Sequence, residues 1–370
     1  MTTTTEALVL HEINGPLSLE TIELTPLQPD EALVQIHATG ICHTDLSCMN
    51  GTLPSAVPHV LGHEGAGTVL STGQSIKNIH KGDKVLLSYT FCTQCQECTS
   101  DHPAYCQDWA TLNFGQRRPN GTISLRTSAG SDLHGSFFGQ SSFSRLAIVN
   151  RSSLVKVAHD APLALLAPLG CGIQTGVGAI LNTLNVQQGS SVVVFGAGAV
   201  GMSAIMAAKM RGASVIVAVD LLDNRLELAT KLGATHTFLG SDPELISRVQ
   251  SACGRNGAQY SVDCTGVPAV VETAIACLGT RGVAATVGAP TPGKKAAIDI
   301  FAQLVMGKTY VGCCEGDSVP SKMIPYLMDQ YAQGNFPLDE MITYYPIREY
   351  EKAIHETKDG KTLKAVLLWD

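Results

Sequence analysis

The sequence predicts an α/β fold in which a doubly wound parallel sheet is joined to a second, mostly β domain. Three observations lead to this prediction. The chain has 370 residues, which exceeds what one hydrophobic core usually organises, so two domains are expected. Up to about residue 170, short alternating runs of polar and apolar residues are separated by glycine, proline and asparagine turns. From about Val192 the pattern changes to strands alternating with helical segments, which is typical of βαβ units.

The first domain is expected to consist mainly of short strands. Ala32–Ala38 and Val85–Ser88 show the alternation of a half-buried strand and are bounded by turn residues. The pattern loosens again after about Tyr310, and Leu363–Trp369 is expected to form a final strand.

The second domain is expected to begin with the apolar strand Ser191–Phe195, followed by a glycine turn and a helix that ends at Arg211 before Gly212. Asp242 is expected to cap a later helix, with Pro243 at its first position, where the missing N–H of proline does no harm. The segments that continue the alternation are Ser214–Val219, Asp223–Leu232, Ala258–Val262, Pro268–Leu278 and Gly282–Val287.

Composition restricts the class of protein. Hydrophobic residues make up 45% and charged residues 15% of the chain, as in an ordinary globular protein. The formal net charge of −7 argues against nucleic acid or an anionic membrane as a partner, because both favour a basic surface. The N-terminal sequence lacks the features of a signal peptide, and the longest apolar run, Val192–Ala208, is too short for a bilayer span. A cytoplasmic protein with reduced thiols is therefore expected.

A Gly-x-Gly-x-x-Gly sequence, formed by Gly196, Gly198 and Gly201, follows the first strand of the second domain and opens a helix. This context favours a dinucleotide site, because the turn lets the backbone approach a pyrophosphate at the helix N-terminus. Asp220, at the end of the next strand, is placed to accept hydrogen bonds from a ribose 2′-hydroxyl and to repel a 2′-phosphate, which favours NAD over NADP. The alternative is a glycine-rich packing turn with a solvent-facing aspartate.

Four cysteines, Cys92, Cys95, Cys98 and Cys106, are closely spaced in one loop. Disulfides are disfavoured, because the first three are each three residues apart and the compartment is expected to be reducing. An iron–sulfur cluster would have a different last spacing, followed by proline. A closed structural zinc site is the favoured interpretation.

Cys42, His63 and Cys171 are candidates for a second zinc site that would leave one coordination position open for chemistry. Each alone is a weak signal, because a single cysteine or histidine is more often a structural residue. Their association with Glu64 and Asp45 strengthens the interpretation, since carboxylates beside metal ligands commonly orient an imidazole.

With these motifs, the chain resembles the zinc-dependent medium-chain alcohol dehydrogenases essentially from end to end. The matching segments are GICHTD, GHEGAGTV, the four-cysteine loop, FGQSSFS, LGCGIQTG, GAGAVG and VDCTG. The segments LGCGIQTG, FFGQSSF and EGDS are most similar to the aryl- (benzyl-) alcohol dehydrogenase branch. The resemblance implies a GroES-like catalytic domain at 1–172 and 312–370, and a Rossmann NAD-binding domain at 173–311.

The resemblance also implies individual roles. Cys42, His63 and Cys171 would hold a catalytic zinc ion, in addition to the structural one, and Glu64 would approach the metal from behind. Asp45 would hold the far nitrogen of His63. Thr44 would provide the hydroxyl beside the substrate oxygen. The implied cofactor contacts are His43 and Lys364 at the pyrophosphate, Arg225 near the adenosine, and Val287.

One position departs from the family pattern. Many relatives have a histidine five residues after the first zinc ligand, where it ends a proton relay to solvent, whereas this chain has Ser47. Water could complete the path, His43 could substitute, or proton release could be slower. The sequence leaves these three alternatives open.

The expected activity is hydride transfer between NAD and a primary alcohol or aldehyde, with aromatic or allylic substrates favoured. Ser88, Tyr89 and the stretch Trp109–Phe114 are candidates for the substrate pocket, although the aromatic residues of that stretch could equally serve packing. The alternatives are a reductase of activated C=C or C=N bonds and a noncatalytic zinc- and nucleotide-binding protein. The segment from Cys106 to Phe137 is long, as in dimeric members of the family that the chain resembles. The resemblance therefore implies a homodimer, with a tetramer as the alternative.

Overall fold

The computed structural model describes residues 3–254 and 256–369 and divides the chain into two compact units. The first unit comprises Met1–Cys171, Val319–Met328 and Leu338–Asp370, and the second comprises Gly172–Ser318 and Asp329–Pro337. The division near residue 172 lies within one residue of the predicted one. The second unit extends beyond the predicted boundary at 311, because the 3-10 turn Glu315–Asp317 packs on a helix of that unit. The predicted domain ends at residues 1 and 370 lie outside the described residues.

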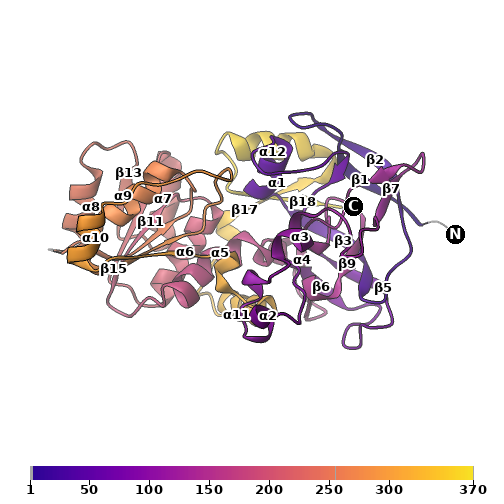
Figure 1. Cartoon of the computed structure of the whole chain (residues 1–370), viewed down its shortest axis with the longest axis horizontal. Coiled ribbons are helices and arrows are strands. Elements are labelled where there is room, and N and C mark those ends of the chain that lie inside the picture. The colour runs from indigo at the N-terminus through magenta and orange to yellow at the C-terminus, as the bar shows by residue number, and fades with distance from the viewer. Residues whose placement is uncertain (1–2, 255, 370) are drawn as a thin grey trace. The chain divides into compact units, whose positions relative to one another are not determined.

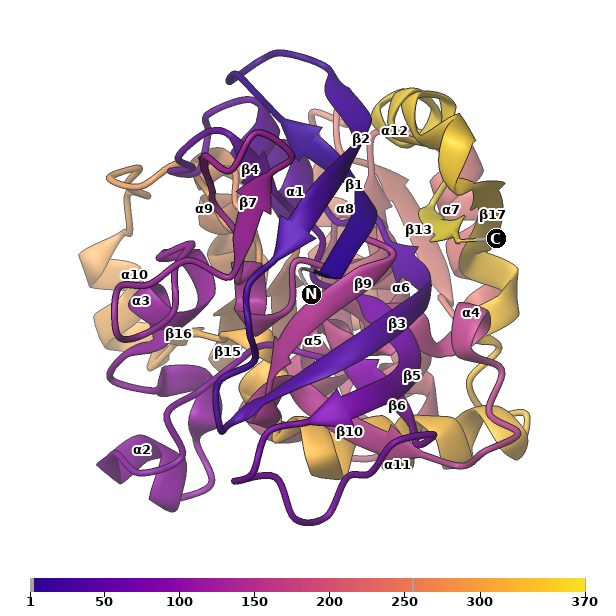
Figure 2. The same ribbon diagram turned by 90° about the vertical axis from the view of Figure 1, so that its right-hand side faces the viewer.

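The first unit is mostly β, as predicted. A five-stranded sheet has the order β4-β1-β2-β7-β8. A seven-stranded sheet has the order β10-β6-β5-β3-β18-β17, with β9 also paired to β3. Figure 2 looks onto β9, β3, β5, β6 and β10 lying side by side. Pairing is antiparallel except between β17 and β18. The strands are β1 (Thr3–Leu10), β2 (Leu17–Leu24), β3 (Glu31–Gly40), β4 (His59–Val60), β5 (Gly65–Thr72), β6 (Lys84–Leu87), β7 (Leu125–Thr127), β8 (Asp132–Leu133), β9 (Leu146–Asn150), β10 (Leu154–Val157), β17 (Ile342–Pro346) and β18 (Lys364–Leu368).

Helices of this unit are short and connect the strands. They are α1 (His43–Met49), α2 (Gln96–Thr99), α3 (Trp109–Phe114), α4 (Leu163–Leu166) and α12 (Tyr350–Lys358), while α11 (Pro320–Ala332) contributes to both units.

Within the described residues, no single helix is long and apolar enough to cross a membrane, although the consecutive helices at 163–170 and 172–183 reach that length and composition when taken together.

The second unit is a six-stranded parallel sheet with the order β13-β12-β11-β14-β15-β16 (Figure 1). Helices α8 and α9 share a buried cluster with Val193 and Phe195 of β11. Because side chains alternate along a strand, the intervening residues face the other side, where α6 and α7 contact β11–β13. This is the predicted doubly wound arrangement. The elements are β11 (Ser191–Phe195), β12 (Val215–Asp220), β13 (His236–Leu239), β14 (Ala258–Asp263), β15 (Leu278–Thr286), β16 (Thr309–Gly312), α5 (Gly172–Gly178), α6 (Ala199–Met210), α7 (Asp223–Leu232), α8 (Leu245–Cys253), α9 (Pro268–Ala276) and α10 (Ile300–Met306).

Most predicted elements of the second unit are present, and β11 and α7 have the predicted bounds. The predicted cap at Asp242 is wrong, because α8 begins at Leu245 with Glu244 at the N-cap position. The Asp242 carboxylate instead accepts a hydrogen bond from the Glu244 N–H at 2.9 Å and pairs with Arg248. The predicted helix Pro268–Leu278 ends at Ala276, because Leu278 already belongs to β15.

Candidate metal centres and active site

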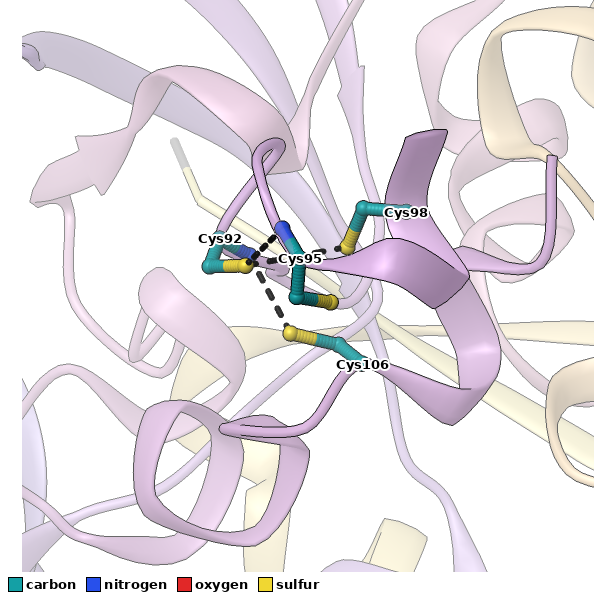
Figure 3. A group of neighbouring side chains, drawn as sticks. All are labelled: Cys92, Cys95, Cys98 and Cys106. Atoms are coloured by element: carbon teal, nitrogen blue, oxygen red, sulfur yellow. Dashed lines mark hydrogen bonds between the residues drawn. The ribbon is translucent and has the colours of Figure 1, made fainter. Parts of the chain in front are cut away.

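The four cysteines of the loop between β6 and α3 converge on one point (Figure 3). Their sulfur atoms all lie within 4.8 Å of one another, and the Sγ atoms of Cys92 and Cys98 are 3.9 Å apart. Four thiolates around zinc at about 2.3 Å would place neighbouring sulfurs about 3.8 Å apart. All four thiols are free of disulfides in the described chain. The loop therefore has the donor set and spacing of a closed tetrahedral zinc site.

Main-chain groups of this loop favour thiolates. The Cys95 N–H donates to Cys92 Sγ, and the Cys92 N–H donates to Cys106 Sγ, both at 3.3 Å. Backbone hydrogen bonds from Gln107 and Cys98 lower the pKa of the Cys95 thiol to about 6. A lowered pKa favours the deprotonated sulfur that binds metal.

A second cluster joins segments that are distant in the sequence. Cys42 precedes α1, His63 and Glu64 lie between β4 and β5, and Cys171 follows a 3-10 turn at Ala167–Gly170. One ligand atom from each lies within 4.8 Å of all the others. His63 and Glu64 are fully buried, yet His63 Nε2 has no hydrogen-bond partner among the described residues. A buried imidazole nitrogen without a partner, beside two thiols, fits a metal ligand.

Asp45 fixes the geometry of this cluster. Its carboxylate lies 3.1 Å from His63 Nδ1 and accepts hydrogen bonds from the N–H groups of Cys42 (2.9 Å) and Gly62 (3.0 Å). The predicted contact between Asp45 and His63 is therefore present. A proton held on Nδ1 leaves the lone pair of Nε2 available to a metal.

The surroundings of Cys42 favour its thiolate, which is the form that binds a metal. A hydrogen bond with Cys171 holds the pKa of Cys42 well below its usual value, although burial opposes the shift. Burial is the largest influence on Glu64 and raises the pKa of its carboxyl.

Glu64 is paired with Lys364, which sequence reasoning placed only at the cofactor. Lys364 Nζ lies 2.8 Å from each carboxylate oxygen of Glu64 and donates to Ile41 O at 3.2 Å. Both side chains are almost completely buried. Gly40 makes this pair possible, because a Cβ at that position would lie 2.0 Å from Glu64 Oε2. The structure thus brings Lys364 to the metal cluster, and its pyrophosphate contact stays a prediction.

Residues of α1 line the same cluster. Thr44 Oγ1 lies 3.7 Å from Cys42 Sγ, so the hydroxyl predicted to lie beside the substrate oxygen is next to a candidate metal ligand. His43 is exposed and Ser47 is half-buried.

Aromatic side chains surround His63. The Phe138 ring stacks on the imidazole at 4.5 Å, and the Phe137 ring meets it edge-on at 5.4 Å. Trp109 and Phe114 of the predicted pocket stretch pack against Phe138 at 6.1 Å and 5.2 Å. Phe137 and Phe138 were not predicted as site residues, although they belong to the segment FFGQSSF, which carries part of the family resemblance. The signal available was two consecutive aromatic residues in that segment.

The other two predicted pocket residues, Ser88 and Tyr89, are buried. Ser88 Oγ donates a hydrogen bond of 2.6 Å to Gly170 O, next to the candidate ligand Cys171. The Tyr89 ring lies 5.8 Å from that of Phe91. Ser88 is thus tied to a metal-ligand segment, and a contact of either side chain with substrate stays a prediction.

The glycine turn in the second unit has the expected shape. Gly196 adopts a positive φ of 86°, and a Cβ on Gly201 would lie 1.9 Å from Gly196 O. A Cβ on Gly198 would meet open space, which leaves the helix N-terminus accessible to a ligand. Asp220 Oδ2 accepts a hydrogen bond from the Ala197 N–H at 2.6 Å.

Two further predicted cofactor residues lie in the same unit. Arg225, on α7, is close enough to Asp220 for that charge to raise its pKa, although burial, the larger effect, lowers the pKa overall. Val287 directly follows β15 and is half-buried. Asp220 and Val287 thus lie at the carboxyl ends of their strands, which is where open parallel sheets bind ligands.

Comparison with known proteins places these features in one family. The family model described as alcohol dehydrogenase GroES-like domain matches residues 28–159, and the model described as zinc-binding dehydrogenase matches residues 199–333. The chain is 39% identical to the geraniol dehydrogenase of Castellaniella defragrans over 98% of this chain and 97% of that protein. It is 35% identical to the alcohol dehydrogenase class-3 of Myxine glutinosa, with coverage of 98% and 97%.

Solved structures agree with this placement. The crystal structure of the benzyl alcohol dehydrogenase from Acinetobacter calcoaceticus has a TM-score of 0.95 at 39% identity and covers 100% of both chains. An alcohol dehydrogenase zinc-binding domain protein from Burkholderia ambifaria has a TM-score of 0.97 at 43% identity, covering 100% of this chain and 99% of its own. With its two cysteine-containing clusters and its glycine turn, this chain belongs to the zinc-dependent medium-chain alcohol dehydrogenase family.

Proposed function

We propose that this enzyme uses NAD to oxidise primary alcohols with an aromatic or allylic group, and to reduce the corresponding aldehydes. The observation that carries the proposal is the buried His63 Nε2, which has no hydrogen-bond partner among the described residues and lies with the sulfurs of Cys42 and Cys171. Three such ligands leave one position open for substrate.

We propose that the chain holds two zinc ions, one in each cluster. At the open site zinc supplies Lewis acidity that makes an alcohol oxygen easier to deprotonate, and NAD supplies the hydride acceptor. Thr44 Oγ1, beside Cys42 Sγ, would accept the alcohol proton while releasing its own hydroxyl proton toward solvent. Lys364 neutralises Glu64 behind the ligands. A neutralised Glu64 leaves Cys42, His63 and Cys171 as the ligand set.

The substrate class is supported by the aromatic residues beside His63. Phe137 and Phe138 contact its ring, and Trp109 and Phe114 extend the same group of aromatic side chains. Stacking on such rings adds about 0.5–1.5 kcal/mol for a flat unsaturated group. The names of two relatives agree with this choice, because geraniol and benzyl alcohol are both primary alcohols with an unsaturated carbon next to the carbinol.

The test is a panel of alcohols and aldehydes followed by nicotinamide absorbance. We expect benzyl-type and allylic primary alcohols to have a higher kcat/KM than ethanol with NAD. Equal efficiency for ethanol, or reaction of secondary or sugar alcohols alone, would contradict the proposed substrate. Turnover of activated C=C or C=N compounds in place of aldehydes would contradict the proposed reaction.

We further propose that the enzyme is a homodimer. Four apolar side chains of α10 are between 60% and 82% exposed: Ile300, Phe301, Leu304 and Val305. Strand β16 lies at the edge of the parallel sheet, with one neighbour in the described part of the chain. An exposed apolar helix face beside an open sheet edge is typical of an interface.

A further inference from the structure

Gln140 is buried next to the metal cluster, and both the nitrogen and the oxygen of its side-chain amide form hydrogen bonds. It follows the 3-10 turn Phe137–Gly139 and is 1% exposed. Its Nε2 donates hydrogen bonds to His63 O at 2.9 Å and to Ser88 O at 3.0 Å. Its Oε1 accepts one from the Gly65 N–H at 3.1 Å. Gln140 thus holds the backbone on both sides of Glu64.

The same amide reaches the segment of the third ligand through Ser88. The Ser88 hydroxyl donates to Gly170 O at 2.6 Å, and Gly170 directly precedes Cys171. The two segments lie in direct contact, because a Cβ on Gly170 would be 1.9 Å from Leu87 O. Gln140 is therefore hydrogen-bonded directly to the main chain of His63, and it is linked to the main chain of Gly170 through Ser88.

Asp45 makes the complementary connection, because its carboxylate contacts both Cys42 and His63. We propose that Gln140 is a positioning residue that holds the His63 and Cys171 segments at the separation zinc requires, as Asp45 does for Cys42 and His63. This inference rests on the zinc site of the proposed function. It adds a residue that touches neither metal nor substrate.

An amide suits this position better than other side chains of its size. Two carbonyl oxygens face Nε2 and one N–H faces Oε1, so donors and acceptors match only in this orientation. A carboxylate would place a charge against two carbonyls, and an apolar side chain would leave three buried backbone groups unbonded.

The backbone around Gln140 is held in an uncommon conformation. Ser136, Phe138 and Ser141 have positive φ values of 59°, 51° and 47°. Positive φ in non-glycine residues costs free energy and persists where surrounding contacts impose it. One such contact is the stacking of Phe138 on His63. The segment that contains Gln140 thus packs against the candidate metal ligand His63.

The experiment compares zinc binding by the purified holoenzyme and its Gln140→Met variant. Zinc affinity of the open site is measured by competition with a chromophoric chelator, and Co²⁺ absorption reports ligand geometry. We expect zinc affinity at the open site to fall at least about tenfold, as for other residues that orient metal ligands. The melting temperature gained on refilling the open site should also shrink, while the four-cysteine site keeps its metal.

Ser142→Ala is the matched control. Ser142 lies in the same segment and is fully buried, and its hydroxyl lies 2.8 Å from Thr39 Oγ1, its one hydrogen-bond partner within residues 3–254 and 256–369. It should leave zinc affinity and the Co²⁺ spectrum unchanged. If Gln140→Met fails to fold, the same measurements are made on Gln140→Asn and Gln140→Glu. The asparagine side chain is too short to reach the three backbone groups, and the glutamate side chain lacks the N–H donors that bond His63 O and Ser88 O.

Three results would overturn the inference, and only the third also overturns the proposed function. If the unmodified enzyme retains zinc at Cys42, His63 and Cys171 and the variants bind it equally well, the role of Gln140 is wrong and the proposed function stands. Equal destabilisation of the zinc-loaded and depleted forms would likewise indicate a purely structural role. If the unmodified enzyme binds no zinc there, the proposed function itself fails.

Discussion

Each carboxylate oxygen of Asp220 accepts a hydrogen bond from the main chain, one from the Ala197 N–H at 2.6 Å and one from the Leu222 N–H at 3.0 Å. Asp45 is bonded to main-chain N–H groups in the same manner beside His63. Backbone donors fix the direction of a carboxylate. At the scale of single residues, the proposed cofactor and metal sites thus have their charged groups oriented before any ligand binds.

For Asp220 this orientation predicts cofactor preference. The unmodified enzyme should use NAD over NADP by at least about tenfold in kcat/KM, because about 1.4 kcal/mol of repulsion from a 2′-phosphate corresponds to that factor. Asp220→Gly should reduce the preference about tenfold. Asp220→Asn separates charge from shape, since it keeps a side-chain acceptor without the charge. Equal use of both cofactors by the unmodified enzyme would contradict the prediction.

His59 predicts how stability depends on pH. Burial, with a smaller effect from His134, lowers the pKa of His59 from 6.5 to about 3. Above pH 6.5 the imidazole is neutral in both folded and unfolded chains and contributes nothing. Between pH 6.5 and 3 the unfolded chain takes up the proton and the folded chain does not, so stability falls as pH falls. By pH 5 the loss amounts to about 2 kcal/mol.

The measurement is urea unfolding at several pH values between 7 and 5. His59→Asn keeps a side-chain partner for Ser55, which lies 2.9 Å from His59 Nδ1, and should lose less stability on acidification than the unmodified enzyme. His159→Asn, which removes an exposed histidine, controls for the change in composition. The same acid sensitivity in all three proteins would show that His59 does not titrate in this way.

At the scale of elements, the cysteine loop and the second cluster differ in how they are built. The four-cysteine site is local, since α2 and the turns around it carry all four ligands within 15 residues of sequence, Cys92 to Cys106. The second site draws its ligands from segments near β3, β5 and the 3-10 turn before α5. A local closed shell should stabilise its own loop, whereas the proposed second site would leave one position exchangeable.

Chelation should therefore act in two stages. We expect two zinc ions per chain in freshly purified enzyme, and a chelator should abolish activity while one zinc and the folded structure remain. Metal analysis, activity and melting temperature are followed together. Cys171→Ser should remove activity with little loss of stability, and Cys95→Ser should mainly lower the melting temperature. A single zinc in fully active enzyme would contradict this prediction.

Elements also show what the sequence could and could not predict. The first βαβ unit was predictable, because a bare apolar strand, a glycine turn and a carboxylate at the next strand end are local signals. Lys364 was placed only at the cofactor, because its ion pair with Glu64 joins residues 300 positions apart. Phe138 was missed because its stacking on His63 joins residues 75 positions apart, which no local pattern indicates. The predicted cap at Asp242 was wrong because its carboxylate accepts a hydrogen bond from the Glu244 N–H, in the turn that precedes α8.

At the scale of the whole molecule, the exposed side chains of α10 and the open edge of β16 predict self-association. Placing glutamate at Phe301 and Leu304, which are 72% and 77% exposed, should convert a dimer into monomers, because two buried charges would face the same groups of a second copy. Light scattering measures the mass. Ile246→Glu, on α8 and 40% exposed, should leave the dimer intact. A monomeric unmodified enzyme would refute the prediction, and a tetramer that the α10 variant reduces to dimers would assign this surface to one of two interfaces.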